Sequence, residues 1–279
     1  EMNIVLNTPF SILKTLKAKS LHEVNYFSDA ELDRLYTVKH IPADTASFKN
    51  INVVFLILES FGREHIGALN KDIPNYKGYT PFLDSLIGEA YAFKNAYANG
   101  RKSIDALPSV ITGIPSVGEP FVLSIYSGNK TTSLAKLLGD EGYETAFFHG
   151  APNGSMGFSA YMNLAGIKHY YGKNEYNNDA DFDGIWGIWD EPFMQYMAGT
   201  LATLKQPFFA SFFSLSSHHP FKVPQKYEGK FPKGNIPLHE PLGYTDNALR
   251  AFFATAAKSD WYANTLFVLC ADNASQSYL

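Results

Sequence analysis

The stretch INVVFLILES, residues 51–60, decides the fold class of this chain. Its centre, Val53 to Leu58, is an uninterrupted apolar run, which is typical of a β-strand buried on both faces. Strands of that kind belong to parallel sheets that helices cover on either side. The run ends in Glu59, and open α/β sheets place their chemistry at the carboxyl ends of such strands.

Three further runs along the chain resemble this strand: ETAFFHG (144–150), PFFASFFSLS (207–216) and NTLFVLCAD (264–272). Helical patterns separate the strands, at 81–90, 107–112, 131–141, 191–204 and 245–259. The regular alternation of strand and helix predicts an α/β fold, a mostly parallel central sheet covered by helices on both faces.

Bulk composition limits the classes of protein that remain. The chain has 279 residues, of which 46% are hydrophobic, so a sizeable core can form. The net charge of −4 offers no basic footprint for nucleic acid. We expect residues 1–50 to form a helical arm or linker, and 51–279 to form a catalytic domain that lacks its C-terminal part. Because residue 1 is not methionine, we interpret the chain as a soluble piece of a longer protein.

Polar side chains stand where the predicted strands end. They are Glu59, His149, His218 and Asp272, and Asn273 follows the last of them. Each alone is more often a helix cap or a satisfied polar residue than a ligand. Together at one sheet edge, carboxylates with an amide oxygen suit Mg²⁺, Mn²⁺ or Ca²⁺, and histidine shifts the preference toward Mn²⁺ or Zn²⁺.

A serine lies at the start of a predicted helix in NGRKSIDALPSVITG, residues 99–113. The ordinary interpretation of Ser103 is a helix N-cap. The same position lies in the positive field of the helix N-terminus, and Lys102 adds a second positive charge. With a metal on its oxygen, the hydroxyl would be a competent nucleophile, and phosphate is attracted to the same place.

The order and spacing of these motifs resemble a known superfamily. LES at a strand end, a Lys-Ser helix start, FFHG, SSHHPF and a final ADN are similar to the alkaline phosphatase–sulfatase superfamily over residues 50–273. The branch that they resemble most is the lipoteichoic acid synthase group of phosphoglycerol transferases. The resemblance implies an alkaline phosphatase-like (sulfatase) fold.

The resemblance also implies roles for the metal-binding and reacting residues. Glu59 matches the first metal-binding acid of the family and Asp272 the paired one. Ser103 matches the nucleophile, whose hydroxyl is also a metal ligand. Asn273 stands where synthases usually have histidine and sulfatases often have asparagine. It is either a ligand, which favours Mg²⁺ or Ca²⁺, or a sign that residues of an Asp-His loop are missing.

Three further residues are assigned to the substrate by the same resemblance. Lys102 matches the basic residue before the nucleophile, which stabilises charge on the reacting phosphate. His218, in SHHPF, matches the histidine that contacts the phosphate end of the substrate. His149 matches the histidine that follows the Glu-Gly-Tyr helix end.

Two departures from the family pattern bear on the substrate. Asp105 and Leu107 stand where sulfatases carry the Pro and Arg that direct conversion of the nucleophile to formylglycine. This disfavours an aldehyde-dependent sulfatase and favours an unmodified serine that acts on a phosphoester. Met156 and Phe158 stand where lipoteichoic acid synthases carry Trp and Arg, so a different head group is compatible.

The predicted function is a metal-dependent transferase or hydrolase of phosphodiesters. It would transfer a phosphoglycerol-type or phosphoethanolamine-type head group from a lipid or glycan phosphoester through a covalent phosphoseryl intermediate. Two alternatives stay open: a sulfatase or phosphodiesterase hydrolase, and a binding domain that has lost its site. The resemblance places the domain in the cell envelope, on the extracytoplasmic side, with a membrane anchor outside this chain.

Two remaining features receive structural interpretations. We expect Trp186, Trp189 and Trp261 to pack in the core or at its rim, in preference to a substrate platform. The acidic stretch NNDADFDG, residues 177–184, has a spacing that resembles a calcium loop. It lacks the closing glutamate of that loop, so we interpret it as a solvated loop.

Overall fold

The computed structural model describes residues 8–16, 20–37, 41 and 47–274. The chain divides into two compact units, Glu1–Lys49 and Asn50–Leu279. The first unit contains helices α1 (Thr8–Thr15) and α2 (Asp29–Leu35). At the start of α2, the Glu31 carboxylate accepts the backbone N–H of Ser28 at 2.9 Å, which is half of a capping box.

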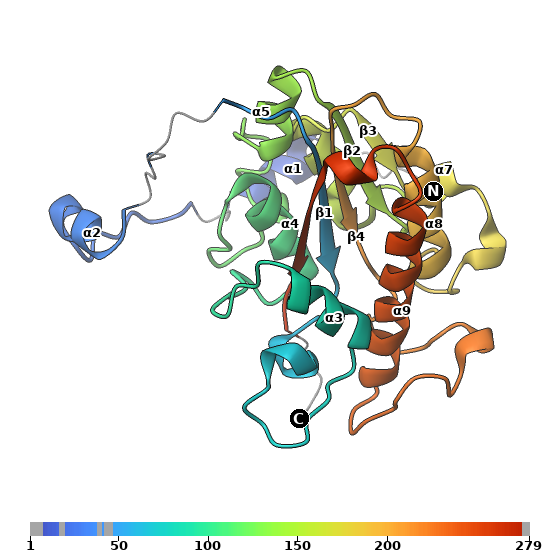
Figure 1. Ribbon diagram of the computed structural model, residues 1–279. Helices are drawn as coiled ribbons and strands as arrows, with labels where there is room; N and C mark the ends of the chain where they lie inside the picture. Colours follow the sequence, from blue (N-terminus) through green and yellow to red (C-terminus); the bar gives the residue numbers. More distant parts are fainter. Residues whose placement is uncertain (1–7, 17–19, 38–40, 42–46, 275–279) are drawn as a thin grey trace. The chain divides into compact units, whose positions relative to one another are not determined.

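The second unit is built on a single sheet of five parallel strands (Figure 1). The strands are β1 (Asn52–Leu58), β2 (Glu144–His149), β3 (His169–Tyr171), β4 (Phe208–Phe213) and β5 (Thr265–Ala271). Their order in space is β3-β2-β4-β1-β5. The parallel α/β sheet is confirmed, and β3 is a short edge strand that the sequence analysis did not predict.

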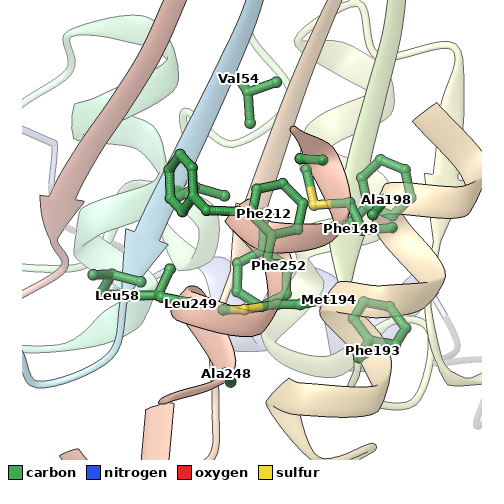
Figure 2. Close-up of a cluster of buried hydrophobic side chains, with 14 of the residues drawn as sticks. Val54, Leu58, Phe148, Phe193, Met194, Ala198, Phe212, Ala248, Leu249 and Phe252 are labelled. Carbon is green, nitrogen blue, oxygen red and sulfur yellow. The ribbon is translucent and has the colours of Figure 1, made fainter. Parts of the chain in front are cut away.

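Alternate residues of each central strand enter opposite cores. In β1, Val54, Leu56 and Leu58 join the core beneath α8 (Asp190–Leu201) and α9 (His239–Ala256), shown in Figure 2. Ile57 joins the other core, beneath α4 (Ser103–Thr112). Because side chains alternate along a strand, Glu59 is expected on the same side of the sheet as Ile57. This parity directs the polar residue at the strand end toward α4.

Helices cover both faces of the sheet, as predicted (Figure 1). One core takes side chains from α3 (Pro81–Glu89), α8 (Asp190–Leu201) and α9 (His239–Ala256). The other takes them from α4 (Ser103–Thr112), α5 (Leu134–Asp140) and α6 (Phe158–Leu164). The remaining helical segments are short: α7 (Lys173–Tyr176), η1 (Arg63–His65), η2 (Gly67–Leu69), η3 (Phe121–Leu123), η4 (Ser155–Gly157), η5 (Asp179–Asp181), η6 (Gln225–Tyr227) and η7 (Tyr262–Asn264).

Helix α9 begins at His239, well ahead of the predicted start at Thr245. Pro241 lies in its first turn, where a missing N–H does no harm because the first amides of a helix have no partner within it. Helix α3 begins at Pro81, as the sequence predicts, and its first N–H groups are capped by another element. The Asp246 carboxylate of α9 accepts the N–H groups of Phe82 and Leu83 at 2.9 and 2.8 Å.

None of the helices in the described ranges is long and apolar enough to span a bilayer.

Candidate active site

Glu59 follows directly on β1 and is buried, with 5% of its surface exposed. The turn after β4 holds its backbone on both sides. Its N–H donates to Ser214 Oγ at 2.7 Å, and its carbonyl oxygen accepts from Ser217 Oγ at 2.6 Å. The backbone that carries the Glu59 carboxylate is therefore held by the turn after β4 as well as by its own strand, β1.

Asp272 stands beside Glu59 because β1 and β5 pair in register, Leu58 opposite Ala271. Its N–H donates to Leu58 O at 3.1 Å, which continues the ladder by one residue. The Asp272 carboxylate is 3% exposed. Parallel pairing thus brings two acids that are far apart in sequence to adjacent positions at one sheet edge.

Ser60 joins the two acids and was not identified from the sequence. Its N–H donates to Asp272 Oδ1 at 2.9 Å, and its hydroxyl donates to Glu59 Oε1 at 2.8 Å. Its φ is 61°, a left-handed conformation that costs a non-glycine residue on the order of 1 kcal/mol. A serine after an acid at a strand end gives no sequence signal for this conformation.

Ser103 is the first residue of α4, and Lys102 has the N-cap geometry. This differs from the ordinary interpretation of Ser103 as the cap itself. The hydroxyl is directed to the acids, because Ser103 Oγ donates to Glu59 Oε2 at 2.7 Å. Lys102 is exposed beside it at the helix start. The predicted nucleophile and the predicted first metal ligand are therefore in direct contact.

Asn273 completes the group and is 7% exposed. Its backbone N–H donates to Asp272 Oδ1 at 2.6 Å, and its side-chain Nδ2 donates to Asp272 Oδ2 at 2.8 Å. The structure therefore brings four predicted residues together, Glu59, Ser103, Asp272 and Asn273. We call these four residues the acid cluster.

The electrostatics of the acid cluster fit a hard cation. Burial, together with the neighbouring Glu59 carboxylate, raises the pKa of Asp272 to about 8. Over the part of the chain that the structure describes, no third His, Cys, Asp or Glu side chain joins the two acids to make a metal site. The donors are thus two carboxylates, a hydroxyl and an amide, and oxygen ligands of this kind suit Mg²⁺, Ca²⁺ or Mn²⁺. A half-turn of the Asn273 amide would present its oxygen in place of Nδ2.

His149 ends β2 and is buried among aromatic rings. Its ring centre lies 5.4 Å from that of Phe158 and 5.6 Å from that of Phe213. Nδ1 donates to Phe213 O at 3.0 Å, and Nε2 has no partner among the described residues. Burial lowers the pKa of His149 to about 4, so the ring is neutral at pH 7. A neutral ring with one unpartnered acceptor nitrogen is compatible with the predicted substrate contact, which stays a prediction.

His218 lies in the turn after β4 and is partly exposed. Its ring centre is 4.3 Å from that of Trp186. Its connection to the acid cluster runs through the preceding residue, because the Ser217 hydroxyl bonds to the Glu59 carbonyl. The sequence analysis did not predict the contact with Trp186.

Comparisons with known proteins identify the family of this chain. The sulfatase family model matches residues 51–279. A lipoteichoic acid synthase-like protein of Bacillus subtilis, YvgJ, is 26% identical and matches 81% of this chain but 37% of its own length. Lipoteichoic acid synthase 2 of the same organism is 25% identical, with 80% and 35% matched. The chain thus spans rather more than a third of these relatives.

Solved structures share the fold. An alkaline phosphatase superfamily protein from Vibrio parahaemolyticus superposes with a TM-score of 0.73 at 28% identity, over 83% of this chain and 56% of that one. The lipoteichoic acid synthase LtaP of Listeria monocytogenes gives 0.72 at 24% identity, over 81% and 57%. The resemblance inferred from the motifs is confirmed, and so is the fold that it implies. This chain belongs to the sulfatase family and has the alkaline phosphatase-like fold.

Proposed function

We propose that this chain carries the active site of a metal-dependent transferase or hydrolase of phosphodiesters, with Ser103 as nucleophile. Its substrate would be a lipid or glycan phosphoester with a phosphoglycerol-type head group. The observation that carries the proposal is the 2.7 Å hydrogen bond from Ser103 Oγ to Glu59 Oε2 inside the acid cluster. A serine at a helix N-terminus, in contact with a buried acid, is placed for attack on an anionic ester.

The chain's own residues account for the proposed displacement. Ser103 Oγ passes its proton to Glu59 Oε2, the acceptor of its hydrogen bond, and forms a bond to phosphorus, while the bond from phosphorus to the lipid alcohol oxygen breaks. Lys102 and the α4 N-terminus stabilise the negative charge on the equatorial oxygens. His218 orients the head group or protonates the leaving alcohol, and the neutral His149 orients the head group by accepting a hydrogen bond through Nε2. An acceptor hydroxyl, or water, then attacks phosphorus, and the Ser103 oxygen leaves and regains its proton.

The residues that would hold a divalent metal are Glu59, Asp272, Asn273 and Ser103. Enzymes of this superfamily generally use divalent metals. When bound, such a cation would lower the pKa of the Ser103 hydroxyl and offset the charge of two adjacent carboxylates.

The curated relatives also support a proposal about location. Several are lipoteichoic acid synthases, whose catalytic domains are extracytoplasmic. We therefore propose an extracytoplasmic site in the cell envelope, with a membrane segment outside this chain. The net charge of −4 gives nucleic acid no basic surface, so we propose no nucleic-acid partner.

The test compares two esters with one leaving group. Purified chain is assayed with Mn²⁺, Mg²⁺ or Ca²⁺ on a p-nitrophenyl phosphodiester and on p-nitrophenyl sulfate. We expect turnover of the phosphodiester and a mass increase on the Ser103 peptide after an acid quench. Ser103→Ala should abolish both signals.

Ser109→Ala is the matched control, since Ser109 lies on the same helix and its hydroxyl donates to the backbone oxygen of Asp105. It should keep activity and stability near the wild-type values. Hydrolysis of the sulfate alone would replace the proposal by a sulfatase function. Full activity of Ser103→Ala would remove Ser103 as the nucleophile. Absence of turnover together with absence of a thermal shift with any of the three metals would favour a binding domain without a catalytic site.

A further inference from the structure

The loop between Asp181 and Trp189, here called the Trp186 arm, is a fixed structure. Its ends are joined because Trp189 N donates to Asp181 O at 3.0 Å, and Asp183 N donates to Gly187 O at 2.9 Å. The tip is held by one carboxylate oxygen. Asp183 Oδ1 accepts the N–H groups of Ile185 and Trp186, both at 2.7 Å, and that of Gly187 at 3.0 Å. The acidic stretch interpreted as a solvated loop therefore supplies the carboxylate that shapes this arm.

The Trp186 arm is docked on the end of β2, directly after His149. Ile188 N donates to Gly150 O at 2.9 Å. A Cβ at Gly187 would lie 2.4 Å from Gly150 O, so the two backbones touch where neither residue has a side chain. The glycine of FFHG thus sets the position of the arm.

Trp186 lies at the tip and covers His218. Its indole Nε1 donates to His219 O at 2.5 Å. Its ring lies 4.3 Å from the ring of His218, at an angle of 60°, and 37% of the residue remains exposed. The ring is therefore fixed at both ends, by the arm and by this hydrogen bond, while part of its apolar surface faces solvent. A ring fixed before binding loses little entropy when a ligand packs on it.

A hollow lies beside these rings. Its lining includes the apolar side chains of Trp186, Trp189, Leu215 and Pro220, and the titratable ones of Asp183, His218 and Lys222. The charges of Asp183 and Lys222 offset each other, and Asp183 Oδ1 already accepts three N–H groups of the arm. An aromatic face attracts cations, but a lysine at the rim opposes them. The hollow therefore favours a neutral group whose C–H bonds can pack on indole and whose hydroxyls can reach the polar rim.

We propose that Trp186 is a specificity-determining residue that packs against the neutral, hydroxylated part of the head group, beside the phosphate end at His218. The proposal rests on the proposed function, because it takes the phosphate end of the substrate to be at His218. It assigns a role to Trp186 and Asp183, which the sequence analysis interpreted as packing and as solvated loop.

The test measures binding, so it does not depend on turnover. Calorimetric titration of the Ser103→Ala chain with Mn²⁺ present uses three probes: glycerol 1-phosphate, O-phosphoethanolamine and inorganic phosphate. We expect glycerol 1-phosphate to bind more tightly than the other two. Adding Trp186→Ala should weaken glycerol 1-phosphate about 5- to 10-fold, as loss of one aromatic contact does, and leave phosphate within about 2-fold. Trp186→Phe keeps an aromatic face and should lose less than about 3-fold.

Each other outcome has a defined meaning. Equal loss for all three probes in Trp186→Ala would show a merely structural role and overturn the proposal. Tighter binding of phosphoethanolamine would overturn the assignment of a neutral group. Absence of binding by all three probes, or a preference for glycerol 1-phosphate that survives Trp186→Ala, would also overturn it. If the binding pattern holds but the wild type turns over no phosphodiester, the proposed function fails and the role of Trp186 stands.

Discussion

Two buried aspartates at the carboxyl edge of this sheet have opposite surroundings. Asp190, at the start of α8, is 1% exposed and is satisfied by donors. Its oxygens accept the N–H groups of Leu215 and Ser216, at 3.0 and 3.1 Å, and the hydroxyl of Thr245 at 3.1 Å. Burial raises the pKa of Asp190 to about 6, and these donors act against the rise. This carboxylate connects α8, α9 and the turn after β4.

Asp272 is buried to a similar degree but faces a second carboxylate, that of Glu59. Its pKa is raised further, to about 8, because the like charge adds to burial. Both carboxylates accept hydrogen bonds from neutral groups, but only Asp272 also lies beside another carboxylate, which makes its surroundings favourable to a cation. Burial is therefore common to both aspartates, and the neighbouring charge is what identifies the candidate functional one.

The largest effect is expected for Asp272→Asn. Removing one of two cation-binding carboxylates should lower phosphodiester turnover by at least about 10³-fold, and Mn²⁺ affinity by at least about 10-fold. The metal-free fold should hold or gain stability, because the folded chain no longer has to keep a buried carboxyl protonated beside Glu59. Steady-state kinetics and Mn²⁺ titration measure the two losses. Turnover within a few-fold of the wild type would contradict the assignment of Asp272.

Asp190→Ala should lower stability and leave Mn²⁺ affinity nearly unchanged, the reverse of what we expect for Asp272→Asn. It leaves the N–H groups of Leu215 and Ser216 and the Thr245 hydroxyl without their acceptor, at a cost of about 3 kcal/mol in the free energy of unfolding. Urea denaturation measures this loss, and Mn²⁺ affinity per folded molecule should stay within about 3-fold. Asp190→Asn, which keeps the shape and one acceptor, should lose less. A variant as stable as the wild type would show that these bonds do not hold the edge together.

The pH dependence of stability should separate the two aspartates. Without metal, the folded chain holds the Asp272 proton up to pH 8, whereas an unfolded aspartate releases it near its ordinary value of 3.8. The free energy of unfolding therefore falls as pH rises from 6.5 to 8, by about 1–2 kcal/mol. Asp190 lowers the free energy of unfolding with rising pH in the same way, but its contribution is largely complete by about pH 6. His149, whose pKa is lowered to about 4, acts in the other direction, mainly below pH 6.5.

Urea denaturation in EDTA at several pH values tests this difference. Asp272→Asn should remove the fall between pH 6.5 and 8, and below pH 6.5 it should remove only the share of the fall that Asp272 causes. Because His149 is present in both proteins, its contribution cancels in the comparison. The same slope in both proteins would show that the Asp272 carboxyl does not carry the raised pKa.

The smallest effect is expected for two serines in the turn after β4, Ser214 and Ser216. Ser214 Oγ accepts the N–H of Glu59 at 2.7 Å, and Ser216 Oγ accepts the N–H of Asp190 at 2.9 Å. Each Ser→Ala change should cost about 1 kcal/mol of stability, because one buried N–H loses its acceptor. Of these two variants, we expect only Ser214→Ala to weaken Mn²⁺ binding. Ser214 bonds to Glu59, which belongs to the acid cluster, whereas Ser216 bonds to Asp190, which does not. Equal metal affinities in the two variants would mean that this support is not needed.

Much of the fold could be predicted because its strands are buried on both faces. Runs such as Val53–Leu58 have few other places in a soluble protein, and their alternation with helices indicates a parallel sheet. β3 escaped prediction because His169–Tyr171 is short, partly exposed and lacks an apolar run. The start of α9 was misplaced because Pro241 resembles a breaker, although the first turn of a helix accepts it.

The candidate site was predicted in part for a related reason. Glu59 and Asp272 end buried strands, and parallel strands bring their carboxyl ends to one edge, so their proximity follows from pattern alone. Ser60 gives no such signal, because its role comes from a left-handed backbone and from bonds to both acids. Trp186 was missed because its contact with His218 depends on how a surface loop docks on Gly150.

By itself, the sequence determined the parallel sheet, the edge that carries polar residues and the order of motifs that marks the sulfatase family. Those properties follow from local hydrophobicity and strand direction, which each segment carries with it. Only the tertiary structure decided which buried aspartate faces another carboxylate, and that Trp186 covers His218. Such properties depend on side chains from distant segments, whose placement is settled when strands pair in register and loops dock on them.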